Sequence, residues 1–340
     1  MTLKEIAQEA NVSISTVSRV INGKGKSAAS QAVCDRIWDI INQNNYIPNA
    51  AAKDLRMQRG EAYKESVGYL ECFLARMPFS EKDQFFSQLA RNLEKEALSL
   101  NYEIKYSFTA RGLKQRDADK ELANSHASGL AILGRCDEGI APLLEKHFTN
   151  ICYVGLNHFS GNCDQVICDG MEAGKTAVHY LLDLGHERIG YLGETQGEIR
   201  YLGYQQAMQE RGLCVNPAYV CNAELSYKGG YEGTKKLLTA TPDLTSVFCA
   251  NDNTAIGAMS ALQEMGLRIP EQISVIGVDN IETSRYVTPA LTTICIPITE
   301  MGKIAAKILV DRIQGGHREQ IKVHLPSRLE IRESCAIPRK

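Results

Sequence analysis

The chain has 340 residues, of which 44% are apolar and 23% are charged, and its formal net charge is -2. This length exceeds one typical domain, so two or three folded units with a sizeable core are expected. The charge excludes a protein that coats nucleic acid over its whole surface, but residues 1–60 carry eight Lys and Arg against five Asp and Glu. A mildly basic head on an acidic body is compatible with one local contact to a polyanion.

The sequence shows no sign of export or membrane insertion. No N-terminal run joins a positive segment to an apolar one, and no stretch approaches the roughly 20 apolar residues of a membrane helix. We therefore expect a cytoplasmic protein without a membrane partner. The eleven cysteines form no CxxC pair. Thiols within apolar runs, such as Cys152 and Cys249, are more typical of core residues than of disulfides or metal ligands.

Three short helices are expected at the start of the chain. Thr2 can cap the first helix, with Glu5 three residues on, and Ser13 is a good N-cap for a second helix that ends near Ile21. A third helix with an apolar stripe is expected over residues 29–43. A helix, a tight turn and a second helix with a polar outer face are typical of a helix-turn-helix DNA-binding unit.

The outer face of the second helix has side chains suited to DNA. They are Ser15, Thr16, Ser18, Arg19 and Asn22. Hydroxyl and amide groups donate hydrogen bonds to phosphate oxygens, and a guanidinium can reach a guanine edge with two donors. Ile14, at the exposed start of the helix, can contact a thymine methyl group. The alternative is that this face is an ordinary solvated surface of a small helical cap.

Beyond the head, a short Ala-rich segment at 50–60 is too short to form a stable helix alone. From residue 66, apolar runs alternate with amphipathic stretches. Strands are expected at "SVGYLECF", "YEIKYSF", "GLAILG", "NICYVGL", "DQVICD", "RIGYLG", "SVFCAN" and "ISVIGVD", and helices at 84–100, 170–184, 202–211 and 254–265. This alternation indicates parallel sheets with helices on both faces. Because the pattern is long for one sheet, we expect an α/β fold with two Rossmann-like lobes.

Features of an enzyme or a cofactor site are weak. The segment "DGMEAGKT" resembles a phosphate-binding loop, but only three residues separate Gly170 from Gly174, and Asp169 occupies the place of a required glycine. A carboxylate there would repel phosphate. No GxSxG motif and no HxxxH pair occurs. We therefore expect no enzyme activity, no cofactor and no metal.

Five segments in order carry a family resemblance. They are "TLKEIAQEANVSISTVSRVING", "YIPNAAAKDL", "LLDLGHERIGYLG", "ANDNTAIGAMSALQEMGLRIPEQISVIGVDN" and "PALTTI". With them the chain resembles the lac/galactose repressor family of bacterial transcriptional regulators. Within this family, the sequence of these segments resembles the branch that regulates galactoside use. The resemblance implies a helix-turn-helix domain at 1–46, a hinge helix or linker at 47–60, and an effector-binding and dimerisation core at 61–340. Lobe 1 would span about 66–160 plus 293–320, and lobe 2 about 161–292 plus 321–340.

The resemblance implies how DNA is bound. The second helix would enter the major groove, where Ile14, Ser15 and Arg19 select the sequence. A hinge helix that orders on DNA would insert Leu55, assisted by Ala52, into the minor groove. The alternative for Leu55 is an apolar residue that packs the linker onto the body. The full set of expected DNA-binding residues is Ser13, Ile14, Ser15, Thr16, Ser18, Arg19, Asn22, Tyr46, Asn49, Ala52 and Leu55.

The resemblance also implies an effector site between the lobes, at strand ends. Arg200, Asn251 and Asp279 match the polar contacts of the family, and a guanidinium, an amide and a carboxylate suit vicinal hydroxyls. Phe85 and Phe86 match aromatics that lie against the apolar face of a sugar. As alternatives, Asp279 closes a turn, and at least one of the two rings belongs to the core.

Two positions depart from the family pattern. Gly155 stands where a carboxylate is frequent, and Leu225 stands where an aromatic is frequent. Asp252, beside the expected effector residue Asn251, has the alternative role of capping the helix that follows. These departures leave the identity of the ligand open.

The sequence therefore predicts a dimeric DNA-binding repressor whose operator affinity is lowered by a small sugar, with a galactoside as the candidate. One alternative keeps the DNA-binding role but replaces the sugar with a purine or a sugar phosphate that acts as co-repressor. Another is a cytoplasmic sugar sensor that acts through protein partners.

Overall fold

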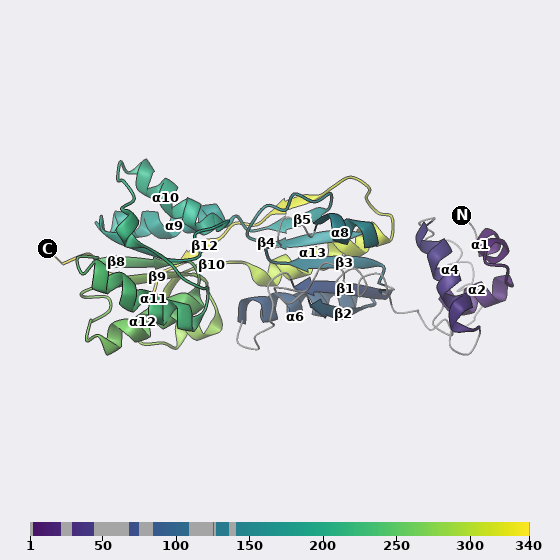
Figure 1. Ribbon diagram of the computed structural model, residues 1–340, viewed down its shortest axis with the longest axis horizontal. Coiled ribbons are helices and arrows are strands. Elements are labelled where there is room, and N and C mark those ends of the chain that lie inside the picture. Colours follow the sequence, from purple (N-terminus) through teal and green to yellow (C-terminus); the bar gives the residue numbers. More distant parts are fainter. Residues whose placement is uncertain are drawn as a thin grey trace.

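The computed structural model describes three bodies, a helical head and two α/β lobes (Figure 1). The described residues are 3–21, 29–43, 68–74, 84–108, 125, 127–135 and 141–339. The predicted fold class, an α/β chain with a helical head and two Rossmann-like lobes, is confirmed. None of the described helices combines the length and the apolar character that a membrane crossing requires.

Three helices form the head around a small apolar core. They are α1 (Leu3–Glu9), α2 (Ile14–Ile21) and α4 (Gln31–Gln43). Apolar residues three or four positions apart lie on one face of a helix, and this spacing directs Ile6 and Val17 to the centre, where both are fully buried. Asn11 makes the turn between α1 and α2 with a φ of 53°, a left-handed conformation that Asn adopts more readily than most residues. The predicted helix, turn and second helix are therefore present.

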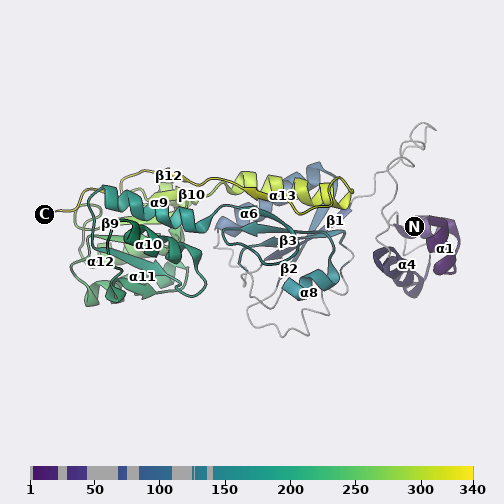
Figure 2. The same cartoon turned by 90° about the horizontal axis from the view of Figure 1, so that it is seen from above.

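The first lobe is built on a parallel sheet with the order β11-β5-β4-β3-β1-β2. Its strands are β1 (Gly68–Leu74), β2 (Tyr102–Phe108), β3 (Gly129–Leu133), β4 (Ile151–Gly155), β5 (Asp164–Ile167) and β11 (Lys322–His324). Its helices are α6 (Gln84–Ser99), α8 (Ala141–His147) and α13 (Ile298–Ile313). Alternate residues of a strand face opposite sides, so Leu133 packs in the cluster with α6 and α13, whereas Ile132 packs with α8. Figure 2 shows these helices on opposite faces of the sheet.

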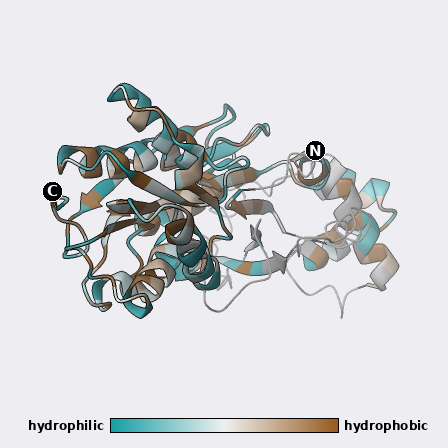
Figure 3. Cartoon of the chain, turned by 60° about the vertical axis from the view of Figure 1, so that its left-hand side comes forward, coloured by the Kyte–Doolittle hydropathy of each residue, from teal (hydrophilic) through white to brown (hydrophobic). Residues whose placement is uncertain are grey.

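The second lobe has a sheet with the order β12-β10-β9-β8-β6-β7, parallel except for the antiparallel pair of β10 and β12. Its strands are β6 (Ile189–Gly193), β7 (Val220–Asn222), β8 (Ser246–Cys249), β9 (Ser274–Asp279), β10 (Thr292–Cys295) and β12 (Arg328–Glu330). Its helices are α9 (Gly170–Asp183), α10 (Ile199–Glu210), α11 (Tyr227–Ala240) and α12 (Asp252–Glu264), with short 3-10 turns at Pro217–Tyr219 and Glu282–Arg285. Both faces of the middle of this sheet are covered, which is why β6, β8 and β9 are buried along their whole length and largely apolar (Figure 3).

The chain passes between the lobes at three short connections, which join β5 to α9, β10 to α13, and β11 to β12. These crossings correct the lobe bounds expected from sequence. β5 and β11 were assigned to lobe 2 but pair within the first sheet, and most of β10 was assigned to lobe 1 but pairs with β9. The bounds were wrong because buried strands of both sheets share one apolar pattern, whereas membership of a sheet depends on the partner strand.

Candidate functional site

The carboxyl ends of strands from both sheets meet at one cleft, the usual place for ligands in open α/β sheets. This cleft is lined by all five predicted effector residues, which are Phe85, Phe86, Arg200, Asn251 and Asp279. The two positions that depart from the family pattern, Gly155 and Leu225, also line it. Five further residues in its wall were not predicted, of which Arg135, Asn157 and Glu198 are polar. The structure thus brings the predicted residues together, while their contact with a ligand stays a prediction.

Arg200 and Glu198 form a buried ion pair at the start of α10. Nε and Nη2 of Arg200 donate to Oε1 and Oε2 of Glu198 over 2.7 Å and 3.1 Å, and the two side chains are 9% and 3% exposed. Burial alone would raise the pKa of the Glu198 carboxyl, but the charge and the hydrogen bonds of Arg200 outweigh it and hold that pKa below its ordinary value. Both groups therefore stay ionised. The guanidinium fork that was expected to face a ligand is largely occupied by the protein itself.

Glu198 also sets where α10 begins. Its Oε1 accepts a hydrogen bond from the Arg200 amide over 3.2 Å, which caps the helix N-terminus. The helix consequently starts at Ile199, three residues before the predicted start at 202. This capping role could not be predicted from the sequence, because Glu is not among the residue types that favour the cap position.

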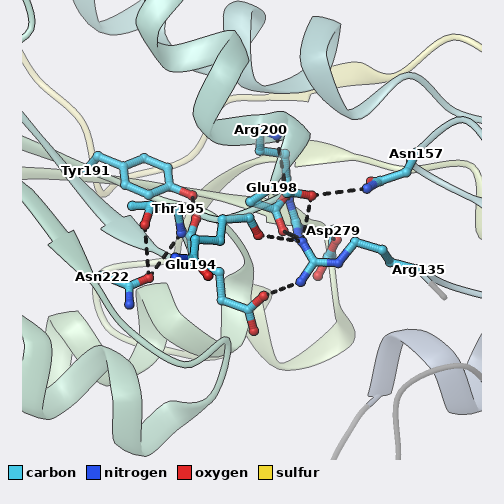
Figure 4. A network of polar contacts seen from close by, with 11 residues as sticks. Arg135, Asn157, Tyr191, Glu194, Thr195, Glu198, Arg200, Asn222 and Asp279 are labelled. Carbon is cyan, nitrogen blue, oxygen red and sulfur yellow. Dashed lines mark hydrogen bonds and ion pairs between the residues drawn. The ribbon is translucent and has the colours of Figure 1, made fainter. Parts of the chain in front are cut away.

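Arg135 reaches from the first lobe across the cleft to the second (Figure 4). It follows β3, and its guanidinium donates to the carboxylate of Glu194 over 2.5 Å and to the carbonyl oxygen of Gly197 over 2.7 Å. Its Nη1 also lies 3.6 Å from Oε2 of Glu198. Asn157, which follows β4, lies 3.5 Å from the same Gly197 carbonyl. Polar side chains of the first lobe therefore contact the loop that precedes α10.

Asp279 lies at the end of β9 and is 6% exposed. Its Oδ1 is 4.0 Å from Nη1 of Arg200, so the carboxylate and the guanidinium face the same part of the cleft. Its φ of 121° is unusual for a residue other than glycine. Strained backbone of this kind is found at ligand sites, where the surrounding structure holds it in place.

Asn251 has a structural role in addition to its place in the cleft. Its Oδ1 accepts a hydrogen bond from the Thr254 amide over 3.0 Å and caps α12. The alternative that Asp252 caps this helix is therefore wrong. Asp252 is instead fully buried, where it accepts hydrogen bonds from the Ile281 amide at 2.9 Å and from the Thr293 hydroxyl at 2.5 Å. Burial raises the pKa of its carboxyl to about 7, although these hydrogen bonds act in the opposite direction.

The two phenylalanines differ in exposure. Phe85 is 6% exposed and belongs to the core cluster, whereas Phe86 is half-buried at the cleft. Their rings pack edge to face with centroids 5.1 Å apart. A Cβ at Gly134 would lie 2.7 Å from the Phe86 ring, so the glycine is what allows the ring to lie against the end of β3. Phe86 is the ring that a ligand can reach, and Phe85 supports it.

The presence of a glycine at position 155 has a local steric explanation. A Cβ at this position would lie 2.4 Å from the hydroxyl of Tyr153, which is 1% exposed and stacked on Phe159 with centroids 5.0 Å apart. A carboxylate could not stand at Gly155 unless the tyrosine moved. Leu225 presents an apolar side chain to the cleft, partly buried against the core.

Four of the expected DNA-facing residues of the head, Ser13, Ile14, Ser15 and Arg19, are exposed at or beside the start of α2 or along it. Ser13 caps the helix, since its Oγ accepts a hydrogen bond from the Thr16 amide over 3.1 Å. Ile14 is 48% exposed, and Ser15 and Arg19 are exposed. Ser18 lies in the same helix. The other expected DNA-binding residues fall outside the described ones, namely Asn22, Tyr46, Asn49, Ala52 and Leu55.

Two segments of the chain match known families. Residues 2–49 match the family described as bacterial regulatory proteins, lacI family, and residues 178–335 match the periplasmic binding protein-like domain. The HTH-type transcriptional repressor PurR of Escherichia fergusonii is 32% identical to the chain, over 98% of the chain and 97% of that repressor. PurR of Escherichia coli O1:K1 / APEC has the same identity and coverage.

Solved structures share the architecture. A LacI family transcriptional regulator from Enterococcus faecium with bound ribose is 29% identical, with a TM-score of 0.70 over 80% of this chain and 100% of that structure. A complex of the transcriptional regulator CelR with cellobiose covers 98% of this chain and 99% of that one with a TM-score of 0.72. At 24% identity, the latter similarity supports the fold alone.

Proposed function

The chain belongs to the lacI family of bacterial regulatory proteins, and we propose that a small sugar, bound between its two lobes, lowers its affinity for operator DNA. Membership of the family makes the chain a DNA-binding transcriptional repressor with a ligand-binding core. The sugar, its site and the direction of its effect are the proposal. The observation that carries it is the cleft, where five residues predicted from separate parts of the sequence line one space.

The composition of the cleft favours a sugar. A hydroxyl group both donates and accepts, so it needs an acceptor such as Asp279 beside a donor such as Arg200. These two groups face each other across 4.0 Å. The half-buried ring of Phe86 can cover the apolar face of a pyranose or furanose. The similar regulator from Enterococcus faecium was solved with ribose, which supports the ligand class, and a galactoside stays the candidate within it.

The second part of the proposal concerns how the head binds DNA. The described residues Ser13, Ile14, Ser15, Thr16 and Arg19 would contact DNA through the exposed side of α2, with Ser18 in the same helix. The hydroxyl groups of Thr16 and Ser18 would position the helix on phosphates, whereas Ile14, Ser15 and Arg19 would reach base edges. The hinge residues Ala52 and Leu55 would widen the minor groove at the centre of the operator.

Thermal melting against a panel of ligands tests the effector. The panel holds neutral mono- and disaccharides, sugar phosphates and purines. A ligand present at 100 times its dissociation constant adds about 2.7 kcal/mol to the free energy of unfolding, which is a readily measured shift in Tm. We expect the shift from a neutral sugar. A shift from purines or sugar phosphates alone would replace the proposal with the co-repressor alternative.

A substitution at Asp279 tests whether the shift in Tm arises from a sugar bound in the cleft. Asp279→Asn keeps the shape of the side chain and removes one charged acceptor, so the sugar should bind roughly ten- to a hundredfold more weakly. Asp243→Asn is the matched control, because Asp243 is an exposed carboxylate before β8, at the opposite end of that sheet. Equal sugar affinity in both variants would show that the site is misplaced.

A further inference from the structure

The start of α10 combines three features that attract anions. A helix N-terminus presents free amide groups and the positive end of the helix dipole. Arg200 adds a buried guanidinium, and Arg135 adds a second one from the other lobe. Guanidinium groups bind carboxylate and phosphate oxygens in a two-pronged geometry. Together these groups form the kind of site that holds the phosphate of a ligand.

In this chain the anion is supplied by the protein. The carboxylate of Glu198 accepts from the Arg200 amide at 3.2 Å and from both prongs of the Arg200 guanidinium at 2.7 Å and 3.1 Å. It also lies 3.6 Å from Arg135. With a side chain only 3% exposed, Glu198 fills the position that a ligand phosphate would need.

The remaining charges reinforce this arrangement. Arg135 donates to Glu194 as well, and Asp279 lies 4.0 Å from the far side of Arg200. In the described part of the cleft and the loop beside it, the carboxylates of Glu194, Glu198 and Asp279 thus outnumber the two guanidinium groups. An incoming anion would have to break a buried bidentate pair and then face an excess of negative charge.

We propose that Glu198 is a specificity-determining residue that restricts the cleft to uncharged ligands by occupying the anion site at the start of α10. This inference rests on the proposed function only in that the effector binds in this cleft. Neutral sugars keep Asp279, Asn251 and one side of Arg200 as partners. Phosphorylated or acidic sugars are excluded.

The test is calorimetric binding of ribose, ribose 5-phosphate and inorganic phosphate to the full chain and to Glu198→Gln. Glutamine preserves the length of the side chain and its acceptor for the helix cap, but without the charge it pairs only weakly with the Arg200 guanidinium, so an anion can displace it. We expect the variant to bind inorganic phosphate and ribose 5-phosphate about ten- to a hundredfold more tightly than the wild type, the effect of one charge-assisted hydrogen bond.

Two variants serve as controls. Glu198→Asp retains the charge and should still exclude phosphate. Glu210→Gln removes the same charge from the other end of α10, where the carboxylate pairs with Lys175, and it should bind phosphate no better than the wild type. Phosphate affinity unchanged in Glu198→Gln, or raised equally in Glu210→Gln, would overturn the inference.

The wild type provides a measurement that needs no variant. If it binds ribose 5-phosphate as tightly as the most tightly bound neutral sugar, Glu198 does not exclude anions and the inference fails, although a sugar effector would stand. If no neutral sugar binds the wild type but Glu198→Gln gains phosphate binding, the inference holds and the sugar effector fails. The two proposals can therefore fail separately.

Discussion

Arg200 illustrates how a residue expected to bind a ligand is shared with the protein. Its Nε and Nη2 are held by Glu198, so the proposed sugar would meet the Nη1 side, next to Asp279. Asn251 is shared in the same way, because its oxygen caps α12. Residues fixed by such internal bonds are pre-organised, and a ligand that uses them loses less freedom on binding.

Arg19 is the residue on which sequence-specific DNA binding should depend most. Arg19→Ala is expected to cost about 1–3 kcal/mol of specific binding free energy and to leave sugar affinity intact. Arg36→Ala removes the same charge from an exposed position of α4 and should weaken specific and non-specific DNA binding alike, by less. Electrophoretic or fluorescence titration of operator and scrambled DNA compares the two. Equal losses in both variants would contradict the base-reading role.

Asp252 makes the stability of the second lobe depend on pH. Its carboxyl has a folded pKa of about 7 against an ordinary value of 3.8, so between these values the folded state holds a proton that the unfolded state has released. The contribution of Asp252 to the free energy of unfolding therefore falls as the pH rises from about 4 to about 7, by at most about 1.4 kcal/mol per pH unit.

Asp252→Asn should remove that dependence. The amide can still accept from the Ile281 amide and donate to the Thr293 hydroxyl, so the variant should fold. Urea unfolding followed by circular dichroism at pH 5 to 8 gives the slope for each protein. We expect the variant to gain stability relative to the wild type as the pH rises. Parallel slopes would show that Asp252 is ionised in the folded state throughout this range.

The elements show what a sequence pattern can and cannot reveal. All eight predicted strands are present. Most are largely apolar because they lie inside a sheet covered on both faces, whereas the edge strand β2 alternates apolar and charged residues. β7, β11 and β12 were missed because three residues are too few to show a pattern, and β10 was missed because two of its four residues are Thr. The assignment of β5, β10 and β11 to lobes was wrong because an apolar pattern does not indicate which strand pairs with which.

The residues of the cleft could likewise be predicted only in part. Arg200, Asn251 and Asp279 could be predicted because they stand in or beside recognisable motifs at the ends of strands. Glu198 and Arg135 could not, because the sequence separates them by more than sixty residues and only the approach of the two lobes brings them together. Both are polar residues in loops, and in the sequence such residues cannot be distinguished from ordinary solvent-exposed ones.

The start of α2 is the element on which presentation of the DNA-facing residues depends. Ser13→Ala removes the hydroxyl that caps this helix and should destabilise the head by about 0.5–2 kcal/mol. Ser13→Asn, which retains a capping oxygen, should cost much less. Fluorescence of Trp38, the only tryptophan in the chain, follows unfolding of the head as temperature rises. Equal melting of both variants would mean that the cap contributes nothing.

In the whole molecule, two lobes joined by three short connections can change their relative position without disrupting either sheet. We propose that the repressor is a homodimer, so that two heads read the half-sites of a pseudo-palindromic operator. A ligand that shifts the lobes would alter how the heads and hinges are presented. By thermodynamic reciprocity, DNA would weaken sugar binding by the factor by which the sugar weakens DNA binding.

The most direct measurement is operator affinity with and without the neutral sugar that raises the melting temperature. Operator sequences can be selected from random DNA with the purified chain, and the affinity can then be titrated at fixed salt, since phosphate contacts make it strongly salt-dependent. We predict that saturating sugar weakens operator binding by roughly 5- to 150-fold, the range of a coupling free energy of about 1–3 kcal/mol. Unchanged or tighter binding in the presence of sugar, or a response to purines or sugar phosphates alone, would contradict the account.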